Sequence, residues 1–259
     1  MEAGPTGIAF SIYDPVRESF LSFENSIWDP KLSWKQQFAD FLSSHPYLRR
    51  EFTRVQFLYE ADRIHTVPGS LYEPEHLNDI TSLAFHFEET ETLLSDHFPQ
   101  PEAWYIYPVP DWLPDLLKSR WENISIRSLQ KIEAELILPL PGKAPEDHFV
   151  LIDARQSCFD LLLCKGNSLL FHNVFRYNTP EDRLYFTLLT LDQLRINSEK
   201  SQIRLSGPEA RNEANLKLFK KYLPGVNLIG PNETLQFAEG IDTQIRTSFY
   251  FLFSSVRCA

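Results

Sequence analysis

The stretch HFVLIDARQSCFDLLLCKGNSLLFHNVFRY, residues 148–177, decides the fold of this chain. It contains three apolar runs, 149–154, 158–164 and 169–175, each of strand length and separated by short polar breaks. Gly166 in the second break supplies the positive φ that a tight hairpin needs. Apolar residues occupy both faces of the first run, as in a strand covered by helices on both sides. The stretch therefore predicts a three-stranded antiparallel meander in an α/β domain.

Helices and strands alternate after the meander. Thr179 is a helix N-cap, because Pro180 follows at the first helical position and acidic residues lie in the first turn. The elements that follow this helix are a strand at 203–207, a helix at 209–223, a strand at 226–230 and a closing helix from 241 to 256, whose FYFLF run is also compatible with a strand. The order β-β-β-α-β-α-β-α is that of a ribonuclease-H-like domain.

The first half of the chain repeats this order loosely. Its predicted elements are strands at 8–13 and 19–24, a helix at 33–43, a strand at 54–60, a Pro-Gly turn leading into a strand at 65–72, a short helix from 74, an irregular acidic stretch at 85–98, a strand at 103–109, a helix at 111–121, a strand at 124–126 and a helix at 130–138. The sequence therefore predicts an α/β fold of two tandem ribonuclease-H-like domains, with mixed sheets flanked by helices.

Proline and glycine place the domain boundary. The segment PLPGKAP, residues 139–145, has too many of both for regular structure. We expect a first domain at 1–138 with an insertion around 61–100, a linker at 139–147 and a second domain at 148–259.

Composition excludes some classes of partner. The net charge of −10 disfavours nucleic acid and anionic membrane surfaces, which both bind basic proteins. Three cysteines do not make a disulfide framework, and Cys158 and Cys164 are expected to be core thiols. No signal peptide or membrane-spanning run is visible. We expect a cytoplasmic protein that binds no nucleic acid and does not insert into membranes.

Two such domains in tandem are the plan of the actin-like ATPases. Residues 67–72, VPGSLY, resemble a segment of the short pilus-assembly and type II secretion members of that superfamily. Residues 104–136 resemble the elements that close their first domain, and 152–171 their second phosphate hairpin. The whole sequence also resembles a bacterial family of short actin-like proteins of unknown function, for which residues 179–194 and 203–207 are typical.

The resemblance implies a nucleotide site, but its motifs are altered. Actin-like phosphate hairpins have the form Asp-x-Gly-x-x-x-Thr, in which glycine lets backbone amides approach phosphate. Asp153 is present, yet Arg155 stands at the glycine position and Phe159 at the threonine position. The first hairpin, around Asp14, has no glycine, and the adenosine motif keeps only Gly207, which proline follows.

These departures predict a vestigial nucleotide site and no catalytic residue. The site residues that the resemblance assigns are Asp14, Asp153, Arg155, Asp160 and Gly207. Arg155 is either a phosphate contact or, as we favour, an exposed hairpin residue. The histidines have no paired metal-ligand spacing, so we expect no metal. We expect no cofactor either, with ATP and Mg²⁺ as the alternative.

Three functions fit this pattern. The sequence favours a degenerate actin-like protein that is a binding or scaffold module without ATP hydrolysis, with protein partners or self-association. A divergent nucleotide-binding ATPase is the alternative. A ribonuclease-H-type nuclease using Asp153 and Asp160 is disfavoured, because residues 203–207 supply no further acid. The acidic aromatic segment 85–107 is either a partner surface or part of the core.

Overall fold

The computed structural model describes residues 1–139 and 148–258. Its contacts group these residues into two compact units. The first unit contains Met1–Ile12 and Phe23–Lys131, and the second contains Tyr13–Ser22 together with the described residues from Ile132 onward. The predicted linker at 139–147 lies outside the described residues except for Pro139, so the expected boundary stays a prediction.

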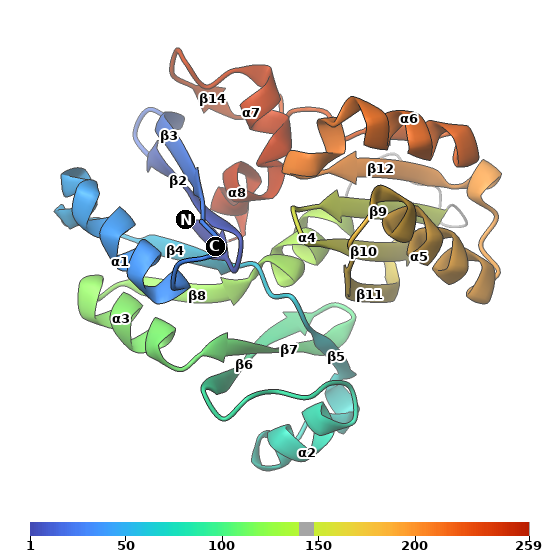
Figure 1. Cartoon of the computed structure of the whole chain (residues 1–259), viewed down its shortest axis with the longest axis horizontal. Helices are drawn as coiled ribbons and strands as arrows, with labels where there is room; N and C mark the ends of the chain where they lie inside the picture. The colour runs from blue at the N-terminus through green and yellow to red at the C-terminus, as the bar shows by residue number, and fades with distance from the viewer. Residues whose placement is uncertain (140–147, 259) are drawn as a thin grey trace. The chain divides into compact units, whose positions relative to one another are not determined.

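The main sheet of the first unit has the strand order β3-β2-β1-β4-β8 (Figure 1). β4 pairs in parallel with both β1 and β8, whereas β2 is antiparallel to β1. The elements of this part are β1 (Glu2–Gly4), β2 (Gly7–Asp14), β3 (Ser19–Ile27), α1 (Trp34–Ser44), β4 (Val55–Tyr59), α3 (Trp112–Arg120), β8 (Ile124–Ser128) and α4 (Leu129–Ile137), which continues into the second unit. The sequence analysis missed β1, which is too short for a periodic signal.

A second sheet, of order β5-β7-β6, is inserted between β4 and α3. Its parts are β5 (His65–Pro68), α2 (Leu77–Ser82), β6 (Glu91–Pro99) and β7 (Glu102–Pro110). Two predictions here were wrong. The stretch 85–98 is not irregular throughout, because Glu91–Pro99 pairs along its whole length with β7. The strand at VPGSLY lies before Gly69, and a 3₁₀ turn, Gly69–Leu71, follows it.

The second unit contains a sheet of order β11-β10-β9-β12-β13. β9, β10 and β11 form the predicted antiparallel meander, while β12 is parallel to both β9 and β13. The elements are β9 (His148–Ala154), β10 (Cys158–Lys165), β11 (Ser168–Arg176), α5 (Pro180–Gln193), β12 (Gln202–Ser206), α6 (Glu213–Tyr222), β13 (Val226–Leu228), β14 (Gln236–Phe237), α7 (Thr243–Ser248) and α8 (Tyr250–Ser254). Both sheets thus have the order of a ribonuclease-H-like fold, as predicted.

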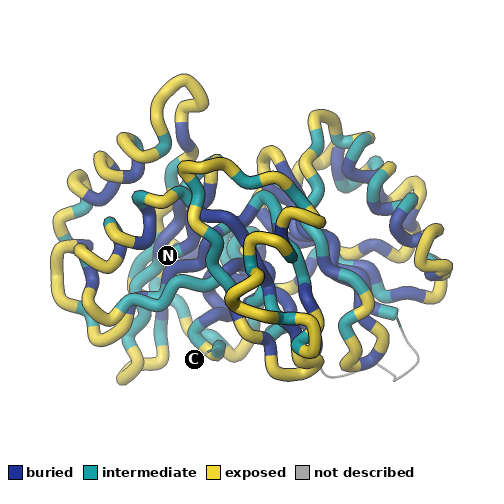
Figure 2. Tube along the Cα trace, turned by 90° about the horizontal axis from the view of Figure 1, so that it is seen from below, coloured by how far each residue is buried: buried dark blue, intermediate teal, exposed yellow. Residues whose placement is uncertain are grey.

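One face of the second sheet carries the apolar core. Val150 and Ile152 of β9 pack there with Phe159 and Leu161 of β10, against apolar side chains of α5 and α6. Buried residues gather along the strands, and exposed residues gather on loops and on the outer sides of helices (Figure 2). The alternation of side chains along a strand leaves Asp153 and Asp160 on the opposite face.

Two helix predictions for this unit need correction. The helix expected at 209–223 is divided into a 3₁₀ turn, Pro208–Arg211, and α6, because the side chain of Asn212 accepts hydrogen bonds from Ala214 and Asn215 and starts a new helix. The closing helix is interrupted at Phe249, which has non-helical backbone angles between α7 and α8. The FYFLF run is therefore mainly helical and not a strand.

The tip of the β2–β3 hairpin belongs to the second unit. β14 pairs in parallel with Ser19 and Phe20 at the start of β3. The Phe20 ring stacks on Phe237 at 5.3 Å and meets the Phe253 ring edge-on at 4.9 Å. Within the described parts of the chain, every helix is too short or too polar to reach across a lipid bilayer.

Candidate functional site

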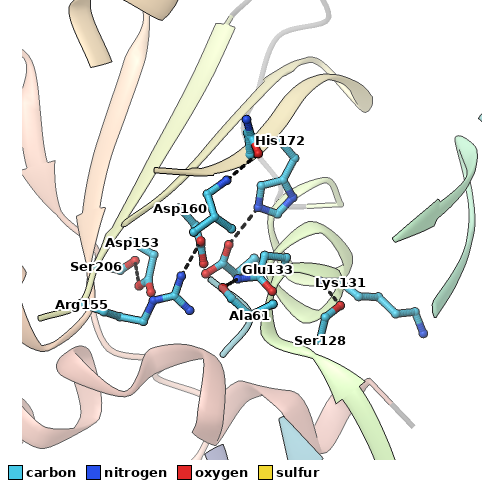
Figure 3. A network of polar contacts seen from close by, with 12 residues as sticks. Ala61, Ser128, Lys131, Glu133, Asp153, Arg155, Asp160, His172 and Ser206 are labelled. Carbon is cyan, nitrogen blue, oxygen red and sulfur yellow. Dashed lines mark hydrogen bonds and ion pairs between the residues drawn. The ribbon is translucent and has the colours of Figure 1, made fainter. Parts of the chain in front are cut away.

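Register brings polar side chains from four strands to one face of the second sheet. Asp153 of β9 lies opposite Asp160 of β10 and also opposite Ser206 of β12. His172 of β11 lies opposite Leu162, which shares a face with Asp160 because the two are two residues apart. The sheet therefore holds Asp153, Asp160, His172 and Ser206 on the face away from α5 and α6 (Figure 3).

Arg155 lies in the turn between β9 and β10, and it is buried. Its side chain forms an ion pair with Asp160, which lies five residues further along the same hairpin (Figure 3). Arg155 is 3% exposed and Asp160 is fully buried. The favoured prediction of an exposed hairpin residue was therefore wrong. Burying a guanidinium without an anionic partner costs free energy, because its desolvation is not compensated. The inward-facing carboxylate of Asp160 provides that partner and so allows Arg155 to be buried.

Glu133 of α4 adds a third carboxyl group. Its Oε2 lies 3.1 Å from His172 Nε2, and both side chains are fully buried. Carboxylate oxygens of Glu133, Asp153 and Asp160 lie within 4.8 Å of one another. We call these three residues, with Arg155, His172 and Ser206, the buried polar cluster.

Burial sets the protonation of the buried polar cluster. Desolvation, reinforced by the charges of Asp160 and Asp153, raises the pKa of Glu133 well above its usual value and so favours its neutral form. Burial, with a smaller effect of Arg155, lowers the pKa of His172 to about 3, so this imidazole is neutral. Burial raises the pKa of Asp153 to about 6, although the Arg155 charge opposes the shift. The protonated Glu133 can donate to Asp160 or to His172 Nε2.

The cluster does not suit a divalent cation as it stands. Three carboxylates within bonding reach of one ion are a plausible ligand set for Mg²⁺. However, the positive charge among them is supplied by Arg155, and burial favours the neutral form of Glu133. Asp153 also accepts a hydrogen bond from the Ser206 hydroxyl. An ion would have to displace Arg155 and remove the proton from Glu133, so the residues present fit a charge-balanced internal network better than a metal.

The turn backbone is also engaged. The Arg155 N–H donates to the Cys158 carbonyl at 3.0 Å, and the Arg155 carbonyl accepts from the Tyr177 hydroxyl. A phosphate hairpin instead needs amides directed at its ligand. In this turn the Arg155 amide closes the hairpin.

Gly207 has a structural reason to be glycine. Its φ is +89°, and a Cβ placed on it would lie 2.4 Å from the Ala154 carbonyl oxygen. The end of β12 therefore passes directly against the end of β9, where only glycine fits. The contact secures the turn that contains Arg155.

Asp14 is engaged locally. Its carboxylate accepts hydrogen bonds from the Val16 and Arg17 amides in the β2–β3 turn, and it lies 3.7 Å from the Arg17 guanidinium. Of the predicted site residues, Asp153, Arg155 and Asp160 come together in the buried polar cluster, and Gly207 lies beside Ala154.

Sequence reasoning missed Glu133, His172 and Ser206. Glu133 lies four residues from both Leu129 and Ile137, on the apolar stripe of α4, and a carboxyl group at such a position signals a buried acid. Ser206 is a polar residue at the end of a strand, and only the register places it beside Asp153. His172 follows Phe171 in a strand with apolar residues on both sides, and only the register reveals its face.

Comparison with solved structures supports the fold. A protein of Bacteroides thetaiotaomicron with an actin-like ATPase fold and unknown function is 20% identical, with a TM-score of 0.81, and the match covers 94% of this chain and 92% of that one. The PilM-PilN type IV pilus biogenesis complex contains a chain that is 12% identical, with a TM-score of 0.65, and the match covers 99% of this chain and 96% of that one.

Curated proteins gave no match to this sequence. The model of the family described as protein of unknown function (DUF3822) matches residues 1–226. The chain has the actin-like ATPase fold and belongs to the DUF3822 family.

Proposed function

We propose that this chain is an actin-like protein that does not hydrolyse ATP and is a cytoplasmic protein-binding module. One observation carries the proposal. Arg155, at the position where a phosphate hairpin needs glycine, is buried and paired with Asp160. Arg155 pairs with Asp160, and the Ser206 hydroxyl donates to Asp153 within the buried polar cluster. These contacts support a turn without the features that bind a phosphate.

The carboxylates support the same conclusion. An actin-like ATPase uses aspartates to orient Mg²⁺ and water. Here Asp153 holds the Ser206 hydroxyl, and Asp160 holds the Arg155 guanidinium. Both acids thus stabilise the interior of the second unit.

Two observations favour protein partners. PilM, a chain of similar fold, was solved in a complex with PilN. The described surface also carries large exposed apolar side chains, among them Val16, Leu83 and Tyr185. A cytoplasmic location agrees with the three cysteines, which are free thiols.

A divergent nucleotide-binding ATPase is the second candidate. The third carboxylate, Glu133, favours it, because an ion displacing Arg155 would find three oxygen ligands. The same three acids are the basis of the nuclease alternative, which predicts metal-dependent cleavage of an RNA–DNA hybrid.

Thermal unfolding with and without millimolar ATP and Mg²⁺ tests the proposal. A ligand that binds only the folded state raises Tm by mass action. We expect no rise and no magnesium-dependent release of phosphate. A nucleotide-binding protein measured in parallel provides the positive control.

Turnover would overturn the proposal if it belonged to this site. The diagnostic result is ATP hydrolysis by the wild-type chain that Asp153→Asn abolishes while the variant still unfolds cooperatively. Asp192→Asn is the matched control, because Asp192 is an exposed aspartate of α5 outside the candidate site.

A further inference from the structure

Acidic residues are concentrated in one inserted segment of the first unit. We call residues 64–110, which contain the β5-β7-β6 sheet and α2, the acidic insertion. It has no lysine or arginine, although the chain has 25 of them. Its acids are Glu73, Glu75, Asp79, Glu88, Glu89, Glu91, Asp96 and Glu102.

Two of these acids stabilise the fold. Glu91 forms an ion pair with Arg63 at 2.5 Å. Asp96 is buried and accepts hydrogen bonds from the amide and hydroxyl of Ser128. The remaining six are exposed, and the Asp79 side chain is 86% exposed. Three of the exposed acids, Glu73, Asp79 and Glu88, lie 3.6–3.9 Å from the histidines His76 and His86. The surface of the acidic insertion therefore carries negative charge that no lysine or arginine of the segment balances.

Apolar and aromatic side chains lie on the same segment. Leu71 and Leu83, which precede and follow the helical stretch containing α2, are 64% and 86% exposed. The Tyr72 and Trp104 rings stack in parallel at 3.9 Å, and both are half-buried. Trp104 lies opposite His97 and two residues from Glu102, so the stacked pair shares its sheet face with exposed polar groups.

We propose that the acidic insertion is the docking surface for a lysine- and arginine-rich segment of a partner protein. Carboxylates recognise such a segment by charge complementarity. Exposed leucines provide contacts for apolar residues between the basic ones. A second copy of this acidic chain, a nucleic acid or an anionic membrane would be repelled by the same charge. The inference rests on the proposed role as a binding module and specifies the partner's chemistry.

Fluorescence anisotropy with a short labelled peptide of lysine, arginine and leucine provides the first test. We expect salt-sensitive binding to the full chain that Glu73→Lys, Glu75→Lys and Asp79→Lys together weaken by about tenfold. The control is Glu199→Lys, Glu233→Lys and Glu239→Lys, which changes exposed acids of the second unit by the same total charge. The control should weaken binding by less than about twofold.

The contribution of the leucines is tested separately. Leu71→Ser with Leu83→Ser should weaken the peptide several-fold and leave the salt dependence unchanged, because neither change alters charge. Equal weakening by both charge reversals would show attraction to net charge alone and would overturn the proposal. Absence of peptide binding would also overturn it.

Photo-crosslinking in cells that express the full chain tests the natural partner. With p-benzoylphenylalanine in place of Leu83, we expect the crosslinked peptide to be rich in lysine and arginine. The same probe in place of Tyr222 in the second unit should not capture that peptide. An acidic peptide, a second copy of this chain or no product would overturn the inference. The ATP experiments are independent, so hydrolysis would refute the proposed function, whereas these results refute only the docking surface.

Discussion

Two antiparallel hairpins of the molecule, β2–β3 and β9–β10, hold charged side chains in different environments. The β2–β3 turn places Asp14 near water, where neighbouring amides and Arg17 satisfy its carboxylate, and Val16 beside it is 91% exposed. The β9–β10 turn places Arg155 in the interior, where it pairs with Asp160. The two turns occupy different places in the matching strand orders, because the β9–β10 turn corresponds to the β1–β2 turn and the β2–β3 turn to the β10–β11 turn. The position of a turn in the sheet therefore bears on whether its charged side chains lie in solvent or in the interior.

The energetic consequences of the two environments differ. An exposed ion pair contributes little to stability, because water screens it and ordering two side chains costs entropy. A buried charge that loses its partner destabilises the protein strongly, because its desolvation is no longer compensated. Matched substitutions in the two hairpins should therefore have unequal effects.

The largest difference is expected from Asp160→Ala. The change leaves the Arg155 guanidinium buried without this carboxylate, and we expect it to lower the free energy of unfolding by about 3–5 kcal/mol. Asp14→Ala, the matched change in the other hairpin, should cost less than about 1 kcal/mol. Urea denaturation followed by circular dichroism measures both.

A double variant separates charge from packing. Arg155→Met with Asp160→Leu removes both charges and should recover much of the loss caused by Asp160→Ala. Equal losses from Asp160→Ala and Asp14→Ala would contradict the contrast between the hairpins.

Gly207→Ala tests how tightly the second turn is held. The new methyl group would meet the Ala154 carbonyl at a positive φ, and we expect a loss of about 3 kcal/mol. Gly240→Ala isolates the backbone term, because Gly240 also has a positive φ but open space around it, and should cost about 1 kcal/mol. Gly225→Ala, with neither feature, should be near neutral. Differential scanning fluorimetry ranks the three; a rank in which Gly207 does not stand first would refute the close packing.

The burial of His172 in the buried polar cluster should make the stability of the fold depend on pH. Burial lowers the pKa of His172 from 6.5 to about 3, so the unfolded chain binds more protons between these values and acid destabilises the fold. His172→Asn should therefore reduce the stability lost between about pH 7.5 and about pH 5 by about 2 kcal/mol.

Proton binding by Asp153 has the opposite effect on the pH dependence of stability. Its pKa is raised from 3.8 to about 6, so the folded chain binds more protons in that window and its stability falls as pH rises. The two effects oppose each other in the wild-type chain. Unfolding by guanidinium across this pH range should thus show a steeper decline with pH in His172→Asn than in wild type, and a shallower decline would contradict the assignment.

The smallest expected difference concerns helix starts. Thr179 and Asp182 form a reciprocal capping box at the start of α5, whereas the Ser33 side chain makes no cap hydrogen bond at α1. Thr179→Ala should cost about 1 kcal/mol and Ser33→Ala only a few tenths. Thermal melts of both variants check this, and equal shifts would show that the cap adds nothing.

Much of the second unit could be predicted from sequence because its signals are local. The meander has three apolar runs with Gly166 between two of them, and α5 has its Thr179 cap and Pro180. Such signals depend on neighbouring residues only. The strand β6 was missed because its acids, Glu91 and Asp96, are satisfied by residues far away in the sequence, Arg63 and Ser128.

The candidate site was less predictable for the same reason. Asp153 and Asp160 were identified from the hairpin, but the burial of Arg155 depends on the register of three strands and on Glu133 from α4. A turn residue with a charged side chain is usually exposed, and nothing local to Arg155 indicates otherwise. Features set by neighbouring residues could therefore be predicted, whereas features that depend on contacts between distant residues could not.

The contacts of Phe20 with β14 and α8 near the C-terminus have a consequence for folding during synthesis. Phe20 leaves the ribosome more than two hundred residues before Phe237 and Phe253, the two rings against which it packs. The β9–β11 meander pairs neighbours and can form at once, whereas the strand pair β3–β14 must wait for the end of translation. A fragment beginning at Ile132 would lack Phe20, leaving Phe237 and Phe253 without its ring and prone to aggregate. The last step of folding should therefore be the pairing of β14 with β3, one of the first strands to be synthesised.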